Sequence, residues 1–467
     1  MKKIAKPFSV ILIMVIIIFS IFSVFGFSYY YGDIKNTVIR GFSDLNFDSD
    51  IGKSTLISVA PSSEDEAAGE VVEVIKERAA KIGLMDYQLY IQDETQNVVL
   101  SVPNDVDCGF DAAETVSFLI SMGNVTIRPG IKYEYYFVDS LEEPAFANPM
   151  DETADSILIN SKYITEAVVS EHKDGDEETY TLDISLSGEG SNLISQLSSP
   201  DNSSGMSYYN ETISIWVDDR MIGYRTLSEP IYDGVLSFDV SSLSRGKMFA
   251  SVIDSGTMPC RLTVHEFEEN EPTAGNSPVD MLMLMGTCVL ILLAFVLIYR
   301  YRAGGFVILV SVFFHFSLLL AFFTRFTGKR APFMMNLPAF AAYMLSVLVT
   351  VFGLIMAFER IKKNSDSDKN LSEIITSGFK SVRTKIFDIN IIFILMSLSV
   401  LFVFGMNGFS LTLFGNAVNN SVYRFADVML FGSVLSFISG YFLPKFLVKQ
   451  ITAIKLFNKP SMLGGKK

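Results

Sequence analysis

Six long apolar stretches stand out along the chain, and each contains few charged side chains. A transmembrane helix needs about 20 apolar residues to cross the roughly 30 Å of hydrocarbon in a bilayer. Each stretch is close to this length, so we expect six membrane-spanning helices. They cover residues 8–28, 281–299, 306–323, 337–357, 389–407 and 425–446.

The segment between the first and second apolar stretches has the pattern of a soluble domain. Residues 64–84 repeat apolar side chains at helical spacing up to a glycine, whereas residues 97–103 alternate like a half-buried strand that ends in a proline. Acidic, Ser- and Asn-rich loops separate such elements. Residues 29–280 are therefore expected to form one large α+β domain. Further strands are predicted at 179–187, 211–219 and 234–240, and a second helix at 188–199.

The soluble and apolar parts of the chain carry opposite charge. The net charge is −14, but residues 32–278 hold about 44 acidic and 15 basic side chains, and the rest of the chain holds about 7 and 22. Lys and Arg flank membrane helices mainly on the cytoplasmic side. Both termini are therefore expected in the cytoplasm and the acidic domain outside it, with the basic loop 324–330 as an exception.

The expected fold is an α-helical membrane bundle of six transmembrane helices with a large α+β extracytoplasmic domain between helices 1 and 2. The first apolar stretch is longer than the core of a secretory signal peptide and lacks a small-x-small cleavage site, so we expect an uncleaved anchor. The predicted segments are a membrane anchor (1–28), an extracytoplasmic head (29–280), a five-helix membrane domain (281–449) and a basic cytoplasmic tail (450–467).

The head shows no residue pattern typical of an enzyme. His172 and His265 stand alone among acidic residues, no glycine-rich phosphate loop precedes a helix, and no Cys/His cluster has metal-ligand spacing. We therefore expect a binding or force-transmitting head without enzymatic activity, cofactor, metal or nucleic-acid partner. Cys108 and Cys260 could form a disulfide in an oxidising compartment or remain free thiols, whereas Cys288 lies in a membrane span.

Four polar residues in or beside the apolar stretches are candidates for an ion path. His315 lies deep inside the third stretch, either on a proton pathway or as a hydrogen-bonded packing residue. Asp388 precedes the fifth stretch, where its carboxylate either caps a helix N-terminus or lies on the ion path. Glu359 and Arg360 end the fourth stretch, either as an anchoring charge pair or as a gate.

Short motifs in both parts of the chain resemble the protein translocase subunit SecD family. Residues 337–361, "LPAFAAYMLSVLVTVFGLIMAFERI", resemble the family's fourth span, which begins LPGIAG and ends FERI. Residues 378–390, "GFKSVRTKIFDIN", place Asp388 and Asn390 on the family's D-x-N, so Asn390 joins the candidate residues. Three segments of the head, at 75–84, 185–190 and 255–264, also resemble segments of the family, and residues 424–439 resemble its sixth span. All of these matches follow the same order along the chain as in the family.

The resemblance implies a membrane half of the resistance-nodulation-division (RND) type and a head made of a base and a mobile tip. It also implies an accessory role in the Sec protein translocase of the cytoplasmic membrane, driven by the proton gradient. The implied partners are a SecF-like subunit, the SecYEG channel and unfolded secretory proteins.

This chain departs from the family at positions that matter for proton movement. SecD proteins carry an aspartate and an asparagine in the fourth span where this chain has Phe352 and Leu354, and an asparagine in the third span where it has His315. Two other functions therefore stay open. The chain could be half of an RND-type exporter of lipids or small molecules, or a membrane-anchored scaffold of the same fold that has lost its coupling to the gradient.

Overall fold

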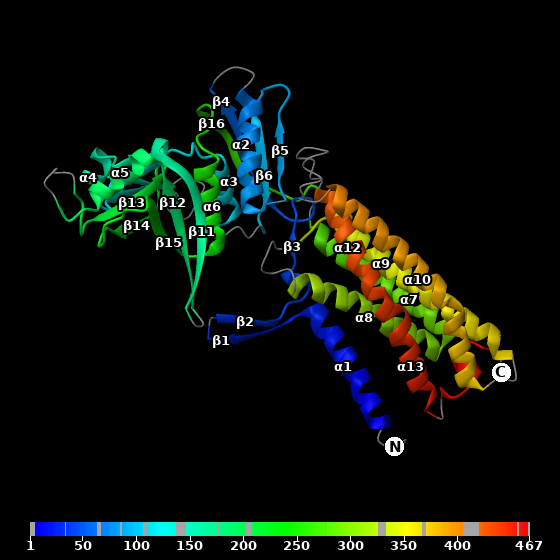
Figure 1. Cartoon of the computed structure of the whole chain (residues 1–467). Helices are drawn as coiled ribbons and strands as arrows, with labels where there is room; N and C mark the ends of the chain where they lie inside the picture. The colour runs from blue at the N-terminus through cyan, green and yellow to red at the C-terminus, as the bar shows by residue number, and fades with distance from the viewer. Residues whose placement is uncertain are drawn as a thin grey trace. The chain divides into compact units, whose positions relative to one another are not determined.

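The chain folds into two compact units, shown in a computed structural model (Figure 1). One unit comprises Lys53–Glu271, and the other joins Met1–Gly52 to Pro272–Lys467. The soluble unit is shorter at both ends than the predicted head, because the flanking residues cluster with the apolar helices. The structure describes residues 5–32, 34–62, 67–84, 86–105, 110–136, 146–174, 177–201, 207–275, 277–325, 333–366, 370–404, 420–454 and 457–465.

A four-stranded antiparallel sheet forms the base of the soluble unit, with strand order β16-β4-β6-β5. Helices α2 (Ala67–Ile82) and α3 (Ala112–Leu119) pack on β4 and β6 and contact each other. This is the split βαβ arrangement of ferredoxin-like folds. The strands are β4 (Ser54–Pro61), β5 (Gln88–Ile91), β6 (Val98–Pro103) and β16 (Leu262–Asn270).

Helix α2 shows how the local sequence produces this base. Val71, Val72 and Ile75 recur at helical spacing and are buried in the core of the soluble unit. Gly83 follows the helix with a φ of +77°, a left-handed conformation that favours glycine. The helix predicted over 64–84 is confirmed. The other predicted elements of the head are confirmed as β6, β12, β13, β15 and α5.

A long insertion between α3 and β16 builds the rest of the soluble unit (Figure 1). One sheet has the order β10-β7-β13-β14, a second has the order β11-β12-β15, and β8 and β9 form a separate ribbon. The strands of the first sheet are β7 (Val125–Pro129), β10 (Ile159–Asn160), β13 (Thr212–Val217) and β14 (Arg220–Thr226). Those of the second sheet and the ribbon are β11 (Ile164–Asp174), β12 (Glu177–Leu186), β15 (Val235–Val240), β8 (Tyr133–Tyr136) and β9 (Phe146–Pro149).

Within the described part of the insertion, three α-helices accompany these sheets. They are α4 (Glu152–Asp155), α5 (Gly188–Leu197) and α6 (Leu243–Asp254). Helix α6 packs on β11 and also contacts α2, so the insertion and the base share one hydrophobic core. Of the cysteines considered for a disulfide, Cys260 is a free thiol and Cys108 lies outside the described residues.

The second unit is built from long apolar helices. They are α1 (Ala5–Phe25), α7 (Pro278–Tyr301), α8 (Ala303–Arg325), α9 (Leu337–Lys363), α10 (Leu371–Phe404), α12 (Asn420–Phe437) and α13 (Leu443–Thr452). Within the described residues, five helical segments are long and apolar enough to cross a membrane, the last of them running continuously from α12 into α13. The described apolar part of α1, Ile11–Phe25, is shorter. The chain is thus a membrane protein with a soluble domain.

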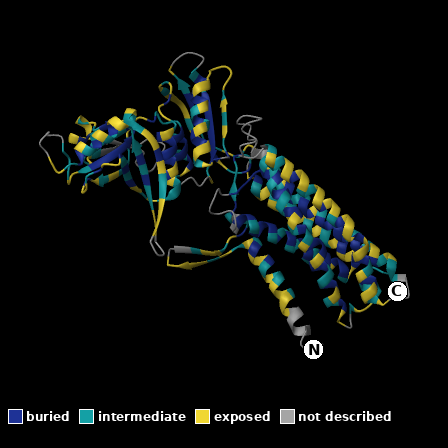
Figure 2. Ribbon diagram, viewed as in Figure 1, coloured by how far each residue is buried: buried dark blue, intermediate teal, exposed yellow. Residues whose placement is uncertain are grey.

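Helix α8 is central to the packing of this unit, because it contacts α1, α7, α9 and α13. Helices α9, α10 and α12 contact one another, and α12 also contacts α8. Helix α7 leaves most of its apolar surface uncovered, since only 6% of the residues in its most apolar stretch are buried. Figure 2 shows exposed residues (yellow) along the outside of the apolar helices and buried residues (dark blue) between them. An apolar surface of this kind is suited to hydrocarbon or to another protein within a membrane.

A π-helical turn, Ile438–Phe442, connects α12 to α13. The cause lies in Pro444, the second residue of α13, because proline has no backbone N–H to donate to the preceding turn. A π-turn inserted at this point lets the helix continue with one wider turn. The wider turn places Ser439 in the interior of the unit, where it is fully buried.

Candidate functional site

His315 lies at the centre of a buried hydrogen-bond network between three helical segments. Its side chain is completely buried. The Nε2 atom lies 2.8 Å from the Ser346 hydroxyl of α9, and Nδ1 lies 2.7 Å from the Ser439 hydroxyl of the π-helical turn. The histidine of α8 therefore connects the third, fourth and last apolar segments through side-chain hydrogen bonds.

The partners of the two serines fit one tautomer of a neutral His315, protonated at Nδ1. The Ser439 hydroxyl donates to the carbonyl oxygen of Leu435 at 3.0 Å, so it accepts from Nδ1–H of His315. Nε2 then carries no proton, and it accepts from the Ser346 hydroxyl. A neutral histidine satisfies every donor and acceptor in this chain of bonds. The geometry matches the packing interpretation of His315, and proton transfer through it stays a prediction.

Small hydroxyl residues continue the polar interior along α8, α9 and α12. Thr350 donates to the Ser436 hydroxyl at 3.1 Å, while the hydroxyls of Ser311 and Ser433 are buried without a partner among the described residues. Gly432 lies directly against Ser346, where a Cβ atom would collide with the serine side chain. Small residues of this kind allow membrane helices to approach closely.

The N-terminal end of α9 is held by both chain segments that lead to the soluble unit. The Asp50 carboxylate accepts from the Leu337 backbone N–H at 2.6 Å, in the first turn of α9. The Ala274 N–H donates to the Asp50 carbonyl oxygen at 2.9 Å. Strand β3 (Asn46–Phe47) adds a parallel pairing with β17 (Met334–Met335), just before α9 begins. The two connections to the soluble unit and the start of α9 are thus one hydrogen-bonded junction.

Burial raises the pKa of Asp50 in this junction from 3.8 to about 6, with the nearby Asp48 as a further cause. The native carboxyl therefore binds its proton more tightly than the unfolded chain does. Between about pH 4 and pH 6 the native state retains a proton that the unfolded state has lost, so the stability contributed by this group falls as the pH rises through that window. The loss is complete above the native pKa.

We expect Asp50→Asn to stabilise the protein at pH 7 by on the order of 1 kcal/mol and to leave it unchanged near pH 4. The amide oxygen can still accept from Leu337, whereas the charge that is costly to bury is removed. Thermal unfolding of the full chain in detergent, followed by circular dichroism at several pH values, measures this difference.

Asp44→Asn, in the short helical turn before β3, is the matched control. The Asp44 carboxylate accepts from the Gly41 N–H at 2.7 Å, and we expect no gain of stability at pH 7 from this change. An equal gain in both variants, or a gain for Asp50→Asn that persists at pH 4, would contradict the assignment to Asp50.

At the opposite end of α9, Glu359 pairs with a residue of another helix. Its carboxylate lies 2.8 Å from Nη2 of Arg300 and accepts from the Tyr301 hydroxyl at 2.6 Å. Among the described residues no ion pair joins Glu359 to Arg360, because adjacent residues of a helix point in different directions, and the anchoring or gating role of the two stays a prediction. Arg360 is exposed in this chain, and α9 continues beyond it to Lys363.

The structure also corrects the helix-capping interpretation of Asp388. Helix α10 starts at Leu371, so Asp388 lies in its interior and cannot cap its N-terminus. Its side chain is exposed, whereas Asn390 is buried and donates to the Ile386 carbonyl at 2.7 Å. The side-chain oxygen of Asn390 has no partner among the described residues. Of the two polar residues in the D-x-N motif, Asp388 thus faces out of the helix bundle and Asn390 faces into it.

Phe352 lies on the outer surface of α9. It is 56% exposed, whereas Leu354 is completely buried beside the helix contacts. The position where the SecD motif has an aspartate therefore points out of this chain's own bundle. The polar network around His315 lies on the buried side of the same helix.

The sequence identified His315 but neither its partners nor the junction at α9. Ser346 and Ser439 are single hydroxyls among apolar residues, and such serines usually bond to their own helix backbone, so only the fold shows that they face the histidine. Asp50 did not stand out in the sequence, because it is one of several acidic residues between the first apolar stretch and β4.

Two SecD proteins illustrate the relatives of this chain. The SecD of Aquifex aeolicus is 24% identical over 244 residues, which is 52% of this chain and 45% of that protein. The SecD of Petrotoga mobilis is 26% identical over 295 residues, which is 62% of this chain and 59% of that protein. The chain thus spans about half the length of these relatives. No protein-family model matches the chain.

The fold is similar to that of a solved translocation protein. The crystal structure of SecDF from Thermus thermophilus superimposes with a TM-score of 0.53 at 17% identity, over 96% of this chain and 59% of that one. At this identity the comparison establishes the fold alone. It covers both the apolar helices and the soluble unit, so the two units belong to one SecDF-like architecture.

Proposed function

Because the chain is a divergent SecD-type protein, we propose that it is an accessory subunit of the Sec translocase that assists the export of unfolded proteins across the cytoplasmic membrane. The observation that carries this proposal is the match in order of both the soluble unit and the membrane helices to SecD and SecDF proteins. The partners in this proposal are a SecF-like subunit and the SecYEG channel.

In this proposal the soluble unit binds the emerging chain and the membrane unit drives its movement. The junction around Asp50 supports such a mechanism, because both connections to the soluble unit are hydrogen-bonded to each other and to the start of α9. A shift of α9 would therefore act on both connections together. An element that links two sites in this way is the physical requirement for mechanical coupling.

We propose that the proton gradient is used by the complex but not through the fourth span of this chain. Phe352 cannot bind a proton, and it faces away from the bundle. An intramembrane carboxylate of the SecF-like subunit would carry the proton, because only an ionisable group can load and release one as the gradient changes. Phe352 also supports the second candidate function, a scaffold of the same fold without coupling to the gradient. We expect no enzymatic activity, cofactor or metal in either case.

The proposed topology has six spans, with both termini in the cytoplasm and the soluble unit outside. In a cysteine-free background, Cys introduced at the exposed residue Glu189 of α5 should react with a membrane-impermeant thiol reagent added to intact cells. Cys introduced at the exposed residue Lys380 of α10 should react only after the membrane is opened. Reaction of both sites in intact cells would contradict the topology.

Contact with export substrate is the direct test of the proposed function. We expect photo-crosslinkers placed at exposed positions of the soluble unit to capture a secretory precursor stalled in the channel. The contact should tolerate many sequences, because an export factor handles many chains and cannot depend on one side-chain pattern. Absence of crosslinks from every position, while the channel itself crosslinks to the same precursor, would refute the proposal.

A further inference from the structure

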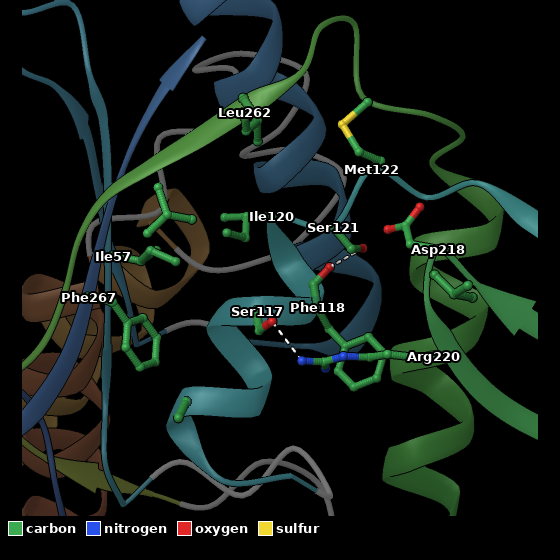
Figure 3. Close-up of a pocket in the computed structure, with 13 residues that line it drawn as sticks. Ile57, Ser117, Phe118, Ile120, Ser121, Met122, Asp218, Arg220, Leu262 and Phe267 are labelled. Carbon is green, nitrogen blue, oxygen red and sulfur yellow. Dashed lines mark hydrogen bonds between the residues drawn. The ribbon is translucent and has the colours of Figure 1, made fainter. Parts of the chain in front are cut away.

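A cavity of about 410 Å³ opens in the soluble unit beside strand β16 (Figure 3). Its lining is mainly apolar and comes from the sheet on one side and helix α3 on the other. Ile57 of β4 and Phe267 of β16 form part of the first wall, and Ala113 and Phe118 of α3 form part of the second. A concave apolar site of this size is typical of a binding site.

Strand β16 is at the end of its sheet and gives the cavity an open side. Among the described strands it pairs with β4 alone, so the backbone groups along its outer edge have no strand partner there. Helix α3 packs on β4 and β6 and leaves the outer strand less covered. Val264 of β16, which lines the cavity, is 52% exposed.

The two faces of β16 have different chemistry. Pairing with β4 places Val264 opposite Val59 and Phe267 opposite Ile57, and paired residues of neighbouring strands point to the same face. The face toward the cavity is therefore apolar at Val264 and Phe267. The register shifts between Val264 and Glu266, as at a β-bulge, and Glu266 pairs with Ser58. Glu266 therefore points to the opposite face. Glu268, two residues further on, shares that face with Glu266.

Polar side chains fix one end of the cavity in place. The guanidinium of Arg220 lies 4.5 Å from the centre of the Phe118 ring and donates to the Ser117 hydroxyl at 2.8 Å, as Figure 3 shows. The Asp218 carboxylate accepts from the backbone N–H groups of Gly123 and Asn124 at 3.2 and 2.9 Å. These contacts hold the cavity open before any ligand enters, which lowers the entropic cost of binding.

We propose that β16 and this cavity bind an extended polypeptide segment in which apolar and basic side chains alternate. The segment would add to the sheet as a further strand, its backbone pairing with the free edge of β16. Its apolar side chains would enter the cavity, and its basic side chains would face Glu266 and Glu268. The inference rests on the proposed function for the source of the segment, an unfolded exported chain.

Charges on an edge strand can instead protect a sheet from aggregation. The arrangement here argues against protection as the sole role, because Glu266 and Glu268 occupy one face while the cavity face stays apolar and exposed. Glu269 lies on the cavity side by the same pairing, but its carboxylate is held by Lys53 Nζ at 2.6 Å. The charges are thus positioned to select a partner as well as to exclude self-association.

Binding of a dye-labelled peptide to the full chain in detergent tests the inference. The probe is Lys-Val-Lys-Phe-Lys-Val-Ser, and its counterpart carries Glu in place of each Lys. We expect the lysine peptide to bind at least about tenfold more tightly at low salt, with the difference shrinking at high salt. Ala113→Leu, which fills the cavity, should weaken binding of the lysine peptide at least about tenfold.

Tyr90→Ala is the matched control, because Tyr90 is 50% exposed on β5 at the other edge of the same sheet. It should bind the peptide like the unchanged protein. If Ala113→Leu does not fold, Val264→Glu places an acid on the exposed cavity face without filling the core and should weaken binding similarly. Unchanged affinity in a folded Ala113→Leu or in Val264→Glu would overturn the inference.

The same crosslinking experiment separates this inference from the proposed function. A crosslinker at Val264 should capture the stalled precursor, and one at Tyr90 should not. Crosslinks elsewhere in the soluble unit but not at Val264 would overturn the peptide site and leave the export function standing. Peptide binding that depends on Ala113, without any precursor crosslink from the soluble unit, would support the site and refute the export function.

Discussion

Replacing Arg78 by methionine is expected to destabilise the soluble unit by about 3–5 kcal/mol. The guanidinium is completely buried, and it donates to the carbonyl oxygens of Leu119, Ser121 and Gly256 at 3.0, 2.6 and 3.0 Å. These acceptors lie at or just after the C-terminal ends of α3 and α6, so one side chain of α2 joins three helices. Methionine keeps the bulk and leaves every acceptor without its donor.

Burial lowers the pKa of Arg78 to about 10, so the side chain stays charged at neutral pH. We therefore expect little change in its contribution to stability between pH 5 and pH 8. Arg78→Lys should recover part of the stability, because one amine cannot reach all of these acceptors in the geometry of a guanidinium.

The fluorescence of Trp216 during a urea titration measures this effect in the full chain. Trp216 is the sole tryptophan of the sequence and is completely buried in β13, so its emission follows the soluble unit. Glu73→Gln, on the exposed side of α2, is the control and should shift the midpoint little. A midpoint for Arg78→Met close to that of Glu73→Gln would contradict the structural role of the buried arginine.

Removing the intramembrane acid of the SecF-like subunit is expected to abolish the stimulation of export by the proton gradient. By contrast, His315→Asn and Asp388→Asn in this chain should leave that stimulation within about twofold of its normal value. Asparagine offers Ser346 and Ser439 both a donor and an acceptor, so it can replace the neutral histidine in the network. Export into inverted membrane vesicles, with and without a proton gradient, provides the measurement.

His315→Leu separates the structural role of the histidine from a role in proton transfer. Leucine removes both hydrogen bonds and leaves two buried serine hydroxyls facing an apolar side chain, so we expect a stability loss of about 1–3 kcal/mol. Loss of gradient stimulation in His315→Asn, with normal amounts of protein in the membrane, would show that this chain carries protons through histidine. The proposal that an acid of the SecF-like subunit alone carries the proton would then be wrong.

Much of the fold follows from local sequence patterns. Helix α2 and strand β6 were predictable because their apolar residues repeat with the period of a helix and of a strand, and Gly83 ends the helix. The apolar helices were predictable from length and composition. The π-turn before Pro444 was not, because a proline can bend or end a helix as well as widen it.

The candidate site was harder to predict, since its contacts join residues far apart in the sequence. Asp388 illustrates the difficulty: its apolar run begins after it, but the helix begins at Leu371, because residues 371–388 form an amphipathic stretch that buries side chains such as Phe379 and Val382. Glu359 of α9 pairs with Arg300 of α7, and the sequence pattern does not show that these two helix ends lie side by side. Hydrophobic patterns identify spans, whereas pairing across helices depends on tertiary structure.

The export function itself is tested most directly by the maturation rate of a secretory precursor in cells depleted of this chain. We predict that pulse-labelled precursor accumulates after depletion and that the unchanged protein restores its processing. A variant lacking Lys53–Glu271 should not restore it, because the proposal requires the soluble unit to engage the exported chain. Normal maturation of several precursors, in cells shown to lack the protein, would contradict the account.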